Sequence, residues 1–267
     1  MLPVYKAISF NKIIEKGGRT KPWLVIVNAG NTPRPYVVKL FETSLIDFKD
    51  SVTSEVLGNV LAKEFNLPVP NAALIDFDDD FIDTIKNQGV LEILEARDTR
   101  LKFGSELLDG YVQFDSEAFK TADIKQVIDI DNVFAFDNLI RNPDRKNLKP
   151  NILIKSNEAY LIDHELGFEI NNETINELKT WQWNSKFYNQ HIFYNFLRDS
   201  ITRHKTEYFD EFGEYLRLLN LNILTPYFHQ LIQARYSPVN HGIITNYLTQ
   251  MKQNSANFVY LMRAKIQ

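Results

Sequence analysis

The sequence contains no cysteine, which excludes disulfide bonds, a cysteine nucleophile and cysteine-ligated zinc. Histidine is also scarce, and its positions fit neither an HExxH motif nor similar metal-ligand spacing. These positions are His164, His191, His204, His229 and His241. We therefore expect the histidines to be surface groups or hydrogen-bonded core groups rather than ligands of a metal centre.

Long apolar runs are missing as well. No segment approaches the ~20 apolar residues of a membrane span, and the opening MLPVYKAISF lacks the basic and then apolar pattern of a signal peptide. An excess of positive charge is also absent, because the formal net charge is −4 and the pI about 5.8. We therefore expect a cytoplasmic protein without a membrane partner and without direct nucleic-acid binding.

What remains is an ordinary globular composition over 267 residues, with 44% hydrophobic and 24% charged residues. The pattern changes near residue 104, from β-rich with one helix to mainly helical. This change predicts an α+β fold with two parts, residues 1–104 and residues 105–267. Ligand sites commonly lie between two such parts.

Apolar runs and turn signals predict the individual elements. Strands are expected at 23–27, 36–41, 72–77, 90–95 and 99–103, with a turn at 28–35 and a solvated acidic loop at 78–80. Helices are expected at 51–65, 116–130, 132–141, 171–182, 189–203, 206–219, 222–235, 238–252 and 254–266. The many aromatic residues of the later helices carry no interleaved basic cluster, so we expect them in the core rather than stacked on bases.

The helix at 51–65 has a second face besides its broad apolar one. Ser51, Glu55, Gly58 and Ala62 fall at i, i+4, i+7 and i+11. Three small residues around one carboxylate predict a close packing contact into which Glu55 points. The alternative is a solvent-facing glutamate, which is the commoner position of Glu on a helix.

Lys39 interrupts the apolar run YVVKLF. Lysine is rarely buried without a partner, so an internal strand would require an anion beside Lys39. Glu55 on the following helix is one candidate partner, and a bound phosphate is another. The alternative is an edge-strand lysine that discourages sheet pairing.

Paired glycines precede the first of these strands. Gly17 and Gly18 are followed by Thr20 and Lys21. Backbone N–H groups of such a loop can cradle phosphate while nearby cations neutralise its charge. A solvated turn is the alternative interpretation.

The stretch from Phe134 to Phe168 is the most informative. Apolar runs at 151–154 and 160–162 flank the turn signal Ser156-Asn157-Glu158, which predicts a tight hairpin. Folding about Asn157 places Asn151 opposite Asp163, with Cβ atoms roughly 4.5–5.5 Å apart. Their oxygens suit Mg²⁺, and Asp144 lies just upstream, a layout typical of phosphoryl transfer. The alternative is polar loop chemistry, because NPD is a common turn-former.

Residues 17–168 contain, in order, GGRTKPWLV, YVVKLF, SEVLGNVLAKEFNLPVP, LKFGSELL, FDNLIRNPDRKN, NILI and YLIDHELGF. This set resembles the HipA-like kinases, a bacterial branch related to the protein-kinase and phosphatidylinositol-kinase folds. The resemblance implies a two-lobed fold with a β-rich nucleotide-binding lobe at 1–104. A helical lobe at 105–267 would carry the catalytic loop and the metal-binding hairpin.

The resemblance also implies roles for single residues. Lys39 would hold the ATP phosphates and would be positioned by Glu55. Asp144 would accept or orient the attacking hydroxyl, and Asn151 and Asp163 would coordinate Mg²⁺. The remaining cofactor-binding residues would be Gly17, Gly18, Thr20, Lys21 and, at the nucleotide hinge, Phe103.

The catalytic loop departs from the family pattern in two ways. The family usually spaces the catalytic Asp and the metal-binding Asn about five residues apart, whereas Asp144 and Asn151 are separated by seven. Lys146 stands where the family often has His. Asn147 is an alternative ligand, but only Asn151 is expected opposite Asp163.

The resulting prediction is an ATP- and Mg²⁺-dependent kinase that phosphorylates a Ser/Thr hydroxyl of a protein substrate. The lengthened loop motivates a second hypothesis, a pseudokinase that binds nucleotide or a partner without transfer. A small-molecule kinase is a third, and the acidic pI disfavours a lipid headgroup as its acceptor. The resemblance further implies an antitoxin-like partner on another chain.

Overall fold

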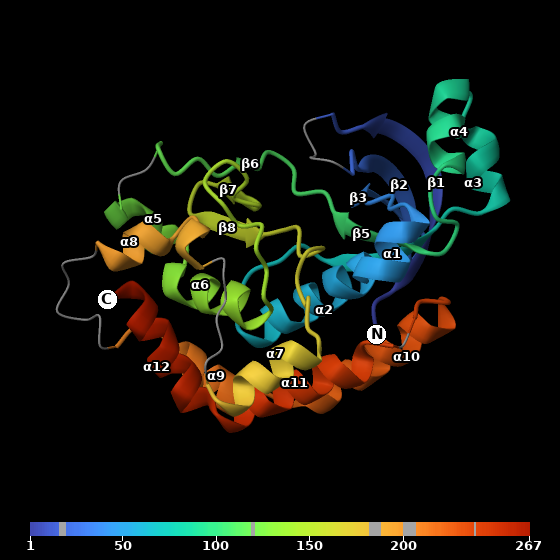
Figure 1. Cartoon of the computed structure of the whole chain (residues 1–267). Coiled ribbons are helices and arrows are strands. Elements are labelled where there is room, and N and C mark those ends of the chain that lie inside the picture. The colour runs from blue at the N-terminus through green and yellow to red at the C-terminus, as the bar shows by residue number, and fades with distance from the viewer. Residues whose placement is uncertain (16–19, 119–120, 182–187, 200–206, 238) are drawn as a thin grey trace.

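The computed structural model describes residues 1–15, 20–118, 121–181, 188–199, 207–237 and 239–267. Strands dominate the N-terminal region and helices the C-terminal region (Figure 1). Five strands close a barrel in the order β1-β2-β3-β5-β4. They are β1 Val4–Ile13, β2 Trp23–Ala29, β3 Thr32–Val38, β4 Ala72–Asp76 and β5 Lys102–Glu106. The barrel core contains the fully buried side chains of Trp23, Val25, Val27 and Val38.

The β2–β3 hairpin is tighter than the sequence pattern predicts. Its turn consists of Gly30 and Asn31, with φ of 61° and 67°, which is the left-handed backbone that Gly and Asn adopt most easily. Pro33 and Pro35 lie within β3, paired with β2 rather than in the turn. They precede the stretch that pairs with β5, so the N–H groups that they lack are not needed in that ladder.

The strand predicted at 36–41 ends earlier, at Val38. The backbone N–H of Lys39 still donates to the carbonyl of Phe103 on β5, at 3.0 Å. Lys39 is therefore anchored at the end of an internal strand of the barrel rather than at an open sheet edge.

Two helices follow β3, α1 Thr43–Lys49 and α2 Ser51–Glu64. Every residue of α2 from Ser51 to Ala62 is buried. One side of the helix packs in the core shared with β4 and β5, through Val52 and Val56. Another side packs in the large C-terminal core, through Leu57 and Leu61. The prediction of a helix with contacts on two faces is confirmed.

Three predictions between α2 and β5 are wrong. The apolar run at 90–95 is a helix, α4 Gln88–Glu95, because the side chain of Asn87 caps it and accepts from the N–H groups of Gly89 and Val90. The three aspartates at 78–80, predicted to form a loop, are the start of a helix instead. Asp78 is the N-cap of α3 Asp79–Thr84. The strand predicted at 99–103 lies a few residues later, as β5.

A second sheet, in the order β6-β7-β8, contains the predicted hairpin and an additional short strand. Its strands are β6 Val112–Gln113, β7 Ile152–Lys155 and β8 Glu158–Leu161. The first two helices of this region are α5 Thr121–Val127 and α6 Ile130–Leu139, followed by α7 Asn172–Lys179 and α8 Tyr194–Arg198. The last are α9 Asp210–Leu218, α10 Thr225–Gln233, α11 His241–Gln253 and α12 Ser255–Ile266, with short 3₁₀ turns η1 Tyr188–Gln190 and η2 Leu221–Leu224.

The C-terminal helices form one core with α2 and α6. Phe65, just after α2, stacks on Phe212 of α9 with ring centroids 4.4 Å apart. Phe212 is fully buried, so its predicted core position is confirmed. The predicted helices at 189–203 and 206–219 extend partly outside the described residues. Among the helices that the structure describes, none is long and apolar enough to span a membrane.

The chain start is also tied to the helical region. The N–H of Leu2 donates to Oε1 of Gln230 on α10 at 2.9 Å, and Nε2 of Gln230 donates to the carbonyl of Leu2 at 2.7 Å. The mixed α and β composition, with strands first and helices later, is as expected. The two-lobed division at residue 104 stays a prediction.

Candidate active site

A cavity of about 710 Å³ lies between the barrel, α2 and the β7–β8 hairpin. It brings together five residues that the sequence singled out, although they are far apart along the chain. These are Lys39, Glu55, Phe103, Asn151 and Asp163. Its apolar lining includes Ile14, Pro22, Val37, Leu107, Leu153 and Leu161.

Lys39 is the charged centre of this cavity. Its ammonium donates to Oε1 of Glu55, to Oδ1 of Asp163 at 2.5 Å and to Oε2 of Glu165 at 3.1 Å. Only 13% of the Lys39 side chain is exposed. Burial acts to lower the pKa of Lys39, but the three carboxylates outweigh it and raise that pKa well above its ordinary value. Lys39 is therefore a firmly charged, buried lysine with carboxylate partners.

Glu55 lies on α2 with 1% of its surface exposed. Burial raises its pKa to about 7, although Lys39 acts in the opposite direction. Glu55, Asp163 and Glu165 have carboxylate oxygens within 4.8 Å of one another. One ammonium cannot fully compensate three clustered carboxylates, so one proton is retained more readily here than in water.

The small-residue face of α2 makes the predicted close contact. Gly58 packs directly on His164, since a Cβ added at Gly58 would lie 2.4 Å from the Cβ of His164. One turn earlier on the helix, Oε2 of Glu55 accepts from the N–H of His164 at 3.2 Å. The hydroxyl of Ser54 donates to the carbonyl of Gly167 at 2.8 Å. The helix α2 therefore fixes the segment 163–167 (sequence DHELG), which begins with Asp163.

The hairpin register differs by one residue from the prediction. Ile152 pairs with Leu161 and Lys155 with Glu158, so the turn has two residues, Ser156 and Asn157. Asn151 then lies opposite Ile162, whose N–H donates to the Asn151 carbonyl at 3.0 Å. The predicted opposition of Asn151 and Asp163 is therefore wrong by one position, because the turn is not centred on Asn157.

Asp144, Asn151 and Asp163 are nevertheless neighbours. The ammonium of Lys149 lies 2.5 Å from Oδ2 of Asp144 and 3.2 Å from Oδ2 of Asp163. The amide nitrogen of Asn151 lies 3.3 Å from the same Oδ2 of Asp144. A cation thus already lies between the two carboxylates.

The longer loop does not separate these groups. Lys146 and Lys149 exchange two backbone hydrogen bonds, at 3.0 and 3.1 Å, which close the intervening residues into a tight turn. Leu148, at the tip of this turn, is fully exposed. The seven-residue spacing is therefore absorbed by an outward turn while both of its ends stay at the site.

The residues predicted to form a phosphate-binding loop are Gly17, Gly18, Thr20 and Lys21, and the structure describes the last two. Thr20 and Lys21 line a separate cavity of about 340 Å³ with Trp23 and Arg97. The ammonium of Lys21 pairs with Glu15 at 3.1 Å on the surface. The structure does not bring these two residues to the large cavity. Gly17 and Gly18 lie outside the described residues, and all four roles stay predictions.

Phe103 is buried on β5, lines the large cavity and accepts the N–H of Lys39 through its carbonyl. Sequence reasoning missed Glu165 and Lys149 as members of the site. The signal for Glu165 was its position two residues after Asp163, next to His164. Lys149 was visible only as part of the apparent insertion.

The comparison with family models decides the family. The model of the HipA-like kinases matches residues 10–220. The chain belongs to the HipA-like kinase family. Membership supports a kinase function.

Among solved structures, the chain is similar to the proinflammatory kinase CtkA of Helicobacter pylori. The TM-score is 0.52 at 12% sequence identity, and the match covers 100% of this chain and 98% of that chain. At this identity the likeness concerns the fold alone. No curated protein matches this HipA-like chain.

Proposed function

We propose that this HipA-like kinase uses ATP and Mg²⁺ to phosphorylate a Ser/Thr hydroxyl of a protein substrate. The observation that carries the proposal is a chain of ion pairs. Lys39 and Asp163 pair with each other and line the large cavity, and Lys149 joins Asp163 to Asp144 beside it. Phosphoryl transfer requires positioning and charge neutralisation more than covalent chemistry from the protein. A lysine, an aspartate and an asparagine at one cavity, with the second aspartate beside them, match that requirement.

Lys39 is suited to hold nucleotide phosphates. Its ammonium is buried, charged and restrained by Glu55, and it has two further carboxylate partners in Asp163 and Glu165. Incoming phosphate oxygens would replace those two partners without leaving the ammonium unpaired. Glu55 would remain as the positioning residue, because it is also held by the N–H of His164.

Asp144 is suited to receive the acceptor hydroxyl. Its carboxylate is partly exposed, with 19% of the side chain accessible, so an acceptor can approach it. In the transfer, the acceptor oxygen forms a bond to the γ-phosphorus as the bond from that phosphorus to the bridging oxygen of ADP breaks. The hydroxyl proton passes to Asp144.

Asn151 and Asp163 would hold Mg²⁺, which prefers oxygen ligands. The fit is supported by the ammonium of Lys149, a positive charge already accommodated between Asp144 and Asp163. When bound, Mg²⁺ neutralises charge on the phosphate oxygens. The chain itself contributes the orientation of the two ligands and a site largely shielded from water.

The choice of a protein acceptor rests on the family resemblance. The fully exposed Leu148 also lines the cavity, beside Lys149, and offers an apolar contact for a peptide at the mouth. An antitoxin-like partner chain stays a prediction of the resemblance.

The direct test is intact-mass spectrometry after incubation with ATP and Mg²⁺. Wild-type protein is compared with Asp144→Ala and Asp163→Ala, each checked for folding by circular dichroism. Phosphate added to the wild type alone, or to a protein acceptor by the wild type alone, supports the proposal. Turnover retained by folded Asp163→Ala contradicts it.

A second candidate function, a nucleotide-binding pseudokinase, is favoured by the pairing of Lys149 with both aspartates. This lysine competes for the positions that phosphoryl transfer requires. ATP binding by titration, with no transfer to any acceptor, would support this alternative. A screen of small-molecule acceptors separates the third candidate, a small-molecule kinase, from a protein kinase.

A further inference from the structure

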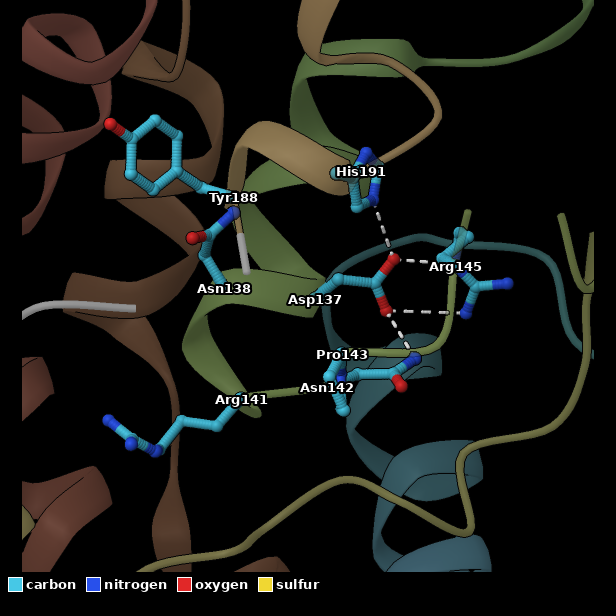
Figure 2. A pocket seen from close by; sticks show the side chains of 8 residues that line it. All are labelled: Asp137, Asn138, Arg141, Asn142, Pro143, Arg145, Tyr188 and His191. Atoms are coloured by element: carbon cyan, nitrogen blue, oxygen red, sulfur yellow. Dashed lines mark hydrogen bonds and ion pairs between the residues drawn. The ribbon is translucent and has the colours of Figure 1, made fainter. Parts of the chain in front are cut away.

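Arg145, directly after Asp144, is almost completely buried, with 1% of its surface exposed. Its guanidinium is paired with Asp137 of α6, from Nε at 2.5 Å and from Nη2 at 3.3 Å. Asp137 also accepts from Nδ2 of Asn142 at 2.9 Å and lies 3.0 Å from Nε2 of His191. Figure 2 shows these groups gathered around the Asp137 carboxylate. The Asp137 carboxylate therefore balances the buried positive charge of Arg145 on the Nε and Nη2 side of the guanidinium.

The other side of the guanidinium faces the hairpin. Nη1 of Arg145 donates to the carbonyl of Asn151 at 2.6 Å, and it lies 3.3 Å from the carbonyl of Pro150 and 3.4 Å from that of Ile162. Asn151 is one expected metal ligand, and Ile162 immediately precedes the other, Asp163. One cation thus contacts the backbone at both ends of the hairpin.

The backbone at these two ligands is unusual. Asn151 has φ of 51° and Asp163 has φ of 66°. Both lie in the left-handed region, which is uncommon for non-glycine residues, although Asn and Asp adopt it more readily than most. Such conformations persist only where the surrounding structure holds them. The charged Nη1 group of Arg145 supplies that restraint by holding the carbonyls of the peptide after Asn151 and of the peptide before Asp163.

We infer that Arg145, clamped by Asp137, is the positioning residue that sets the spacing and orientation of Asn151 and Asp163 and thereby the affinity for the metal ion. This inference rests on the proposed function, because it concerns the same metal-binding pair. It goes beyond that proposal in placing the control of metal affinity on a residue that contacts neither nucleotide nor metal.

The first test uses Arg145→Lys, which keeps the positive charge but loses the planar fork that reaches Asp137 and the carbonyls together. Removing a residue that orients metal ligands typically weakens metal binding about 10–100-fold. We expect a weakening in that range for Mn²⁺, titrated alone and followed by electron paramagnetic resonance. Binding of a fluorescent ATP analogue in EDTA should change less than twofold, because the contacts of Lys39 are not altered.

Arg141→Lys is the matched control. Arg141 is in the same loop and donates from Nε to the carbonyl of Glu169 at 3.1 Å, and its side chain points away from Asp137 in Figure 2. Arg141→Lys makes the same Arg-to-Lys change at a residue that makes no hydrogen bond to the β7–β8 hairpin. Mn²⁺ affinity equal to that of the wild type is expected for this variant.

Asp137→Asn/Arg145→Gln is the second variant, in case Arg145→Lys fails to fold. It removes both buried charges together, so neither is left without a partner. Weak Mn²⁺ binding by the folded double variant, with nucleotide binding retained, supports the inference. Wild-type affinity in either folded variant overturns it, and so does unfolding of both, which would assign Arg145 to folding alone.

The wild type separates this inference from the proposed function. A wild-type protein that binds neither Mn²⁺ nor the ATP analogue overturns both. Wild-type binding that Arg145→Lys retains in full overturns the positioning role only and leaves the proposed function intact.

Discussion

Gly58 of α2 lies against the Cβ of His164, the residue that follows Asp163, and leaves no room for a methyl group between them. The contact joins the helix that carries Glu55 to the segment that carries Asp163. Close packing therefore requires a small residue at position 58. A larger residue there would also change how Glu55 and Asp163 lie relative to each other.

Gly58→Ala is expected to destabilise the protein, by about 1–3 kcal/mol, because an added Cβ would overlap His164. The sign is informative, since Gly→Ala within a helix otherwise stabilises by about 1 kcal/mol. Gly242→Ala in α11 is the control, because a Cβ there meets no atom within 4 Å. Urea unfolding of the two variants measures the effect, and equal stability of both would contradict it.

Lys39→Met is expected to reduce phosphoryl transfer at least 100-fold, because it removes the charge that the proposal assigns to the phosphates. It also leaves three clustered carboxylates without their shared cation. Transfer is followed by intact mass or by radiolabelled phosphate. The control is Lys12→Met, on the exposed part of β1, which should transfer phosphate as the wild type does. Transfer retained in Lys39→Met would show that Lys39 has no role in the mechanism.

Lys149→Met is expected to strengthen binding of Mn²⁺ in the absence of nucleotide by about three- to tenfold. The ammonium that now pairs with Asp144 and Asp163 would no longer compete with the metal ion, and partly exposed ion pairs are worth on the order of 1 kcal/mol. Lys146→Met, in the same turn, is the control. Unchanged or weaker Mn²⁺ binding in Lys149→Met would show that the lysine does not compete.

Glu55 is expected to make stability depend on pH. Burial raises its folded pKa to about 7, above its unfolded value, so the folded state holds the proton more tightly. Its contribution is full at low pH and is lost as the pH rises toward 7, by on the order of 2 kcal/mol between pH 5.5 and 7.5.

The comparison with Glu55→Gln isolates this effect. Burial lowers the pKa of His164 to about 3 and also lowers that of His191, so both histidines reduce stability below pH 6.5 in each protein. Urea unfolding of the wild type and Glu55→Gln at several pH values gives the difference between them. The wild type should lose stability relative to the variant as the pH rises, and a constant difference would contradict the assignment.

Sequence periodicity was sufficient for α2, because Val52, Val56 and Val60 repeat at helical spacing. It also located the second packing face, since Gly58 and Glu55 lie at the same helical side. The short run at 90–95 was misread because four apolar residues with two glutamates fit a strand as well as a helix. The deciding signal was local, the cap formed by Asn87.

Side-chain partners across the fold were less predictable. Lys39 and Glu55 were expected as a pair, but Glu165 and Lys149 join the cluster only through tertiary packing. The hairpin was expected, yet its register depends on the two-residue turn at Ser156 and Asn157. A shift of one residue leaves the elements unchanged and alters which atoms face each other.

The outward turn between Lys146 and Lys149 makes the distance along the chain a poor guide to the distance in space. Lys146 and Lys149 close this turn through their backbone hydrogen bonds, and Leu148 at its tip is fully exposed. Residues can therefore be gained or lost at the tip while Asp144 and Asn151 keep their places. A motif search that demands a fixed spacing between these two residues would therefore overlook chains of this kind. A pattern that leaves the interval open and asks for the following hairpin would find them.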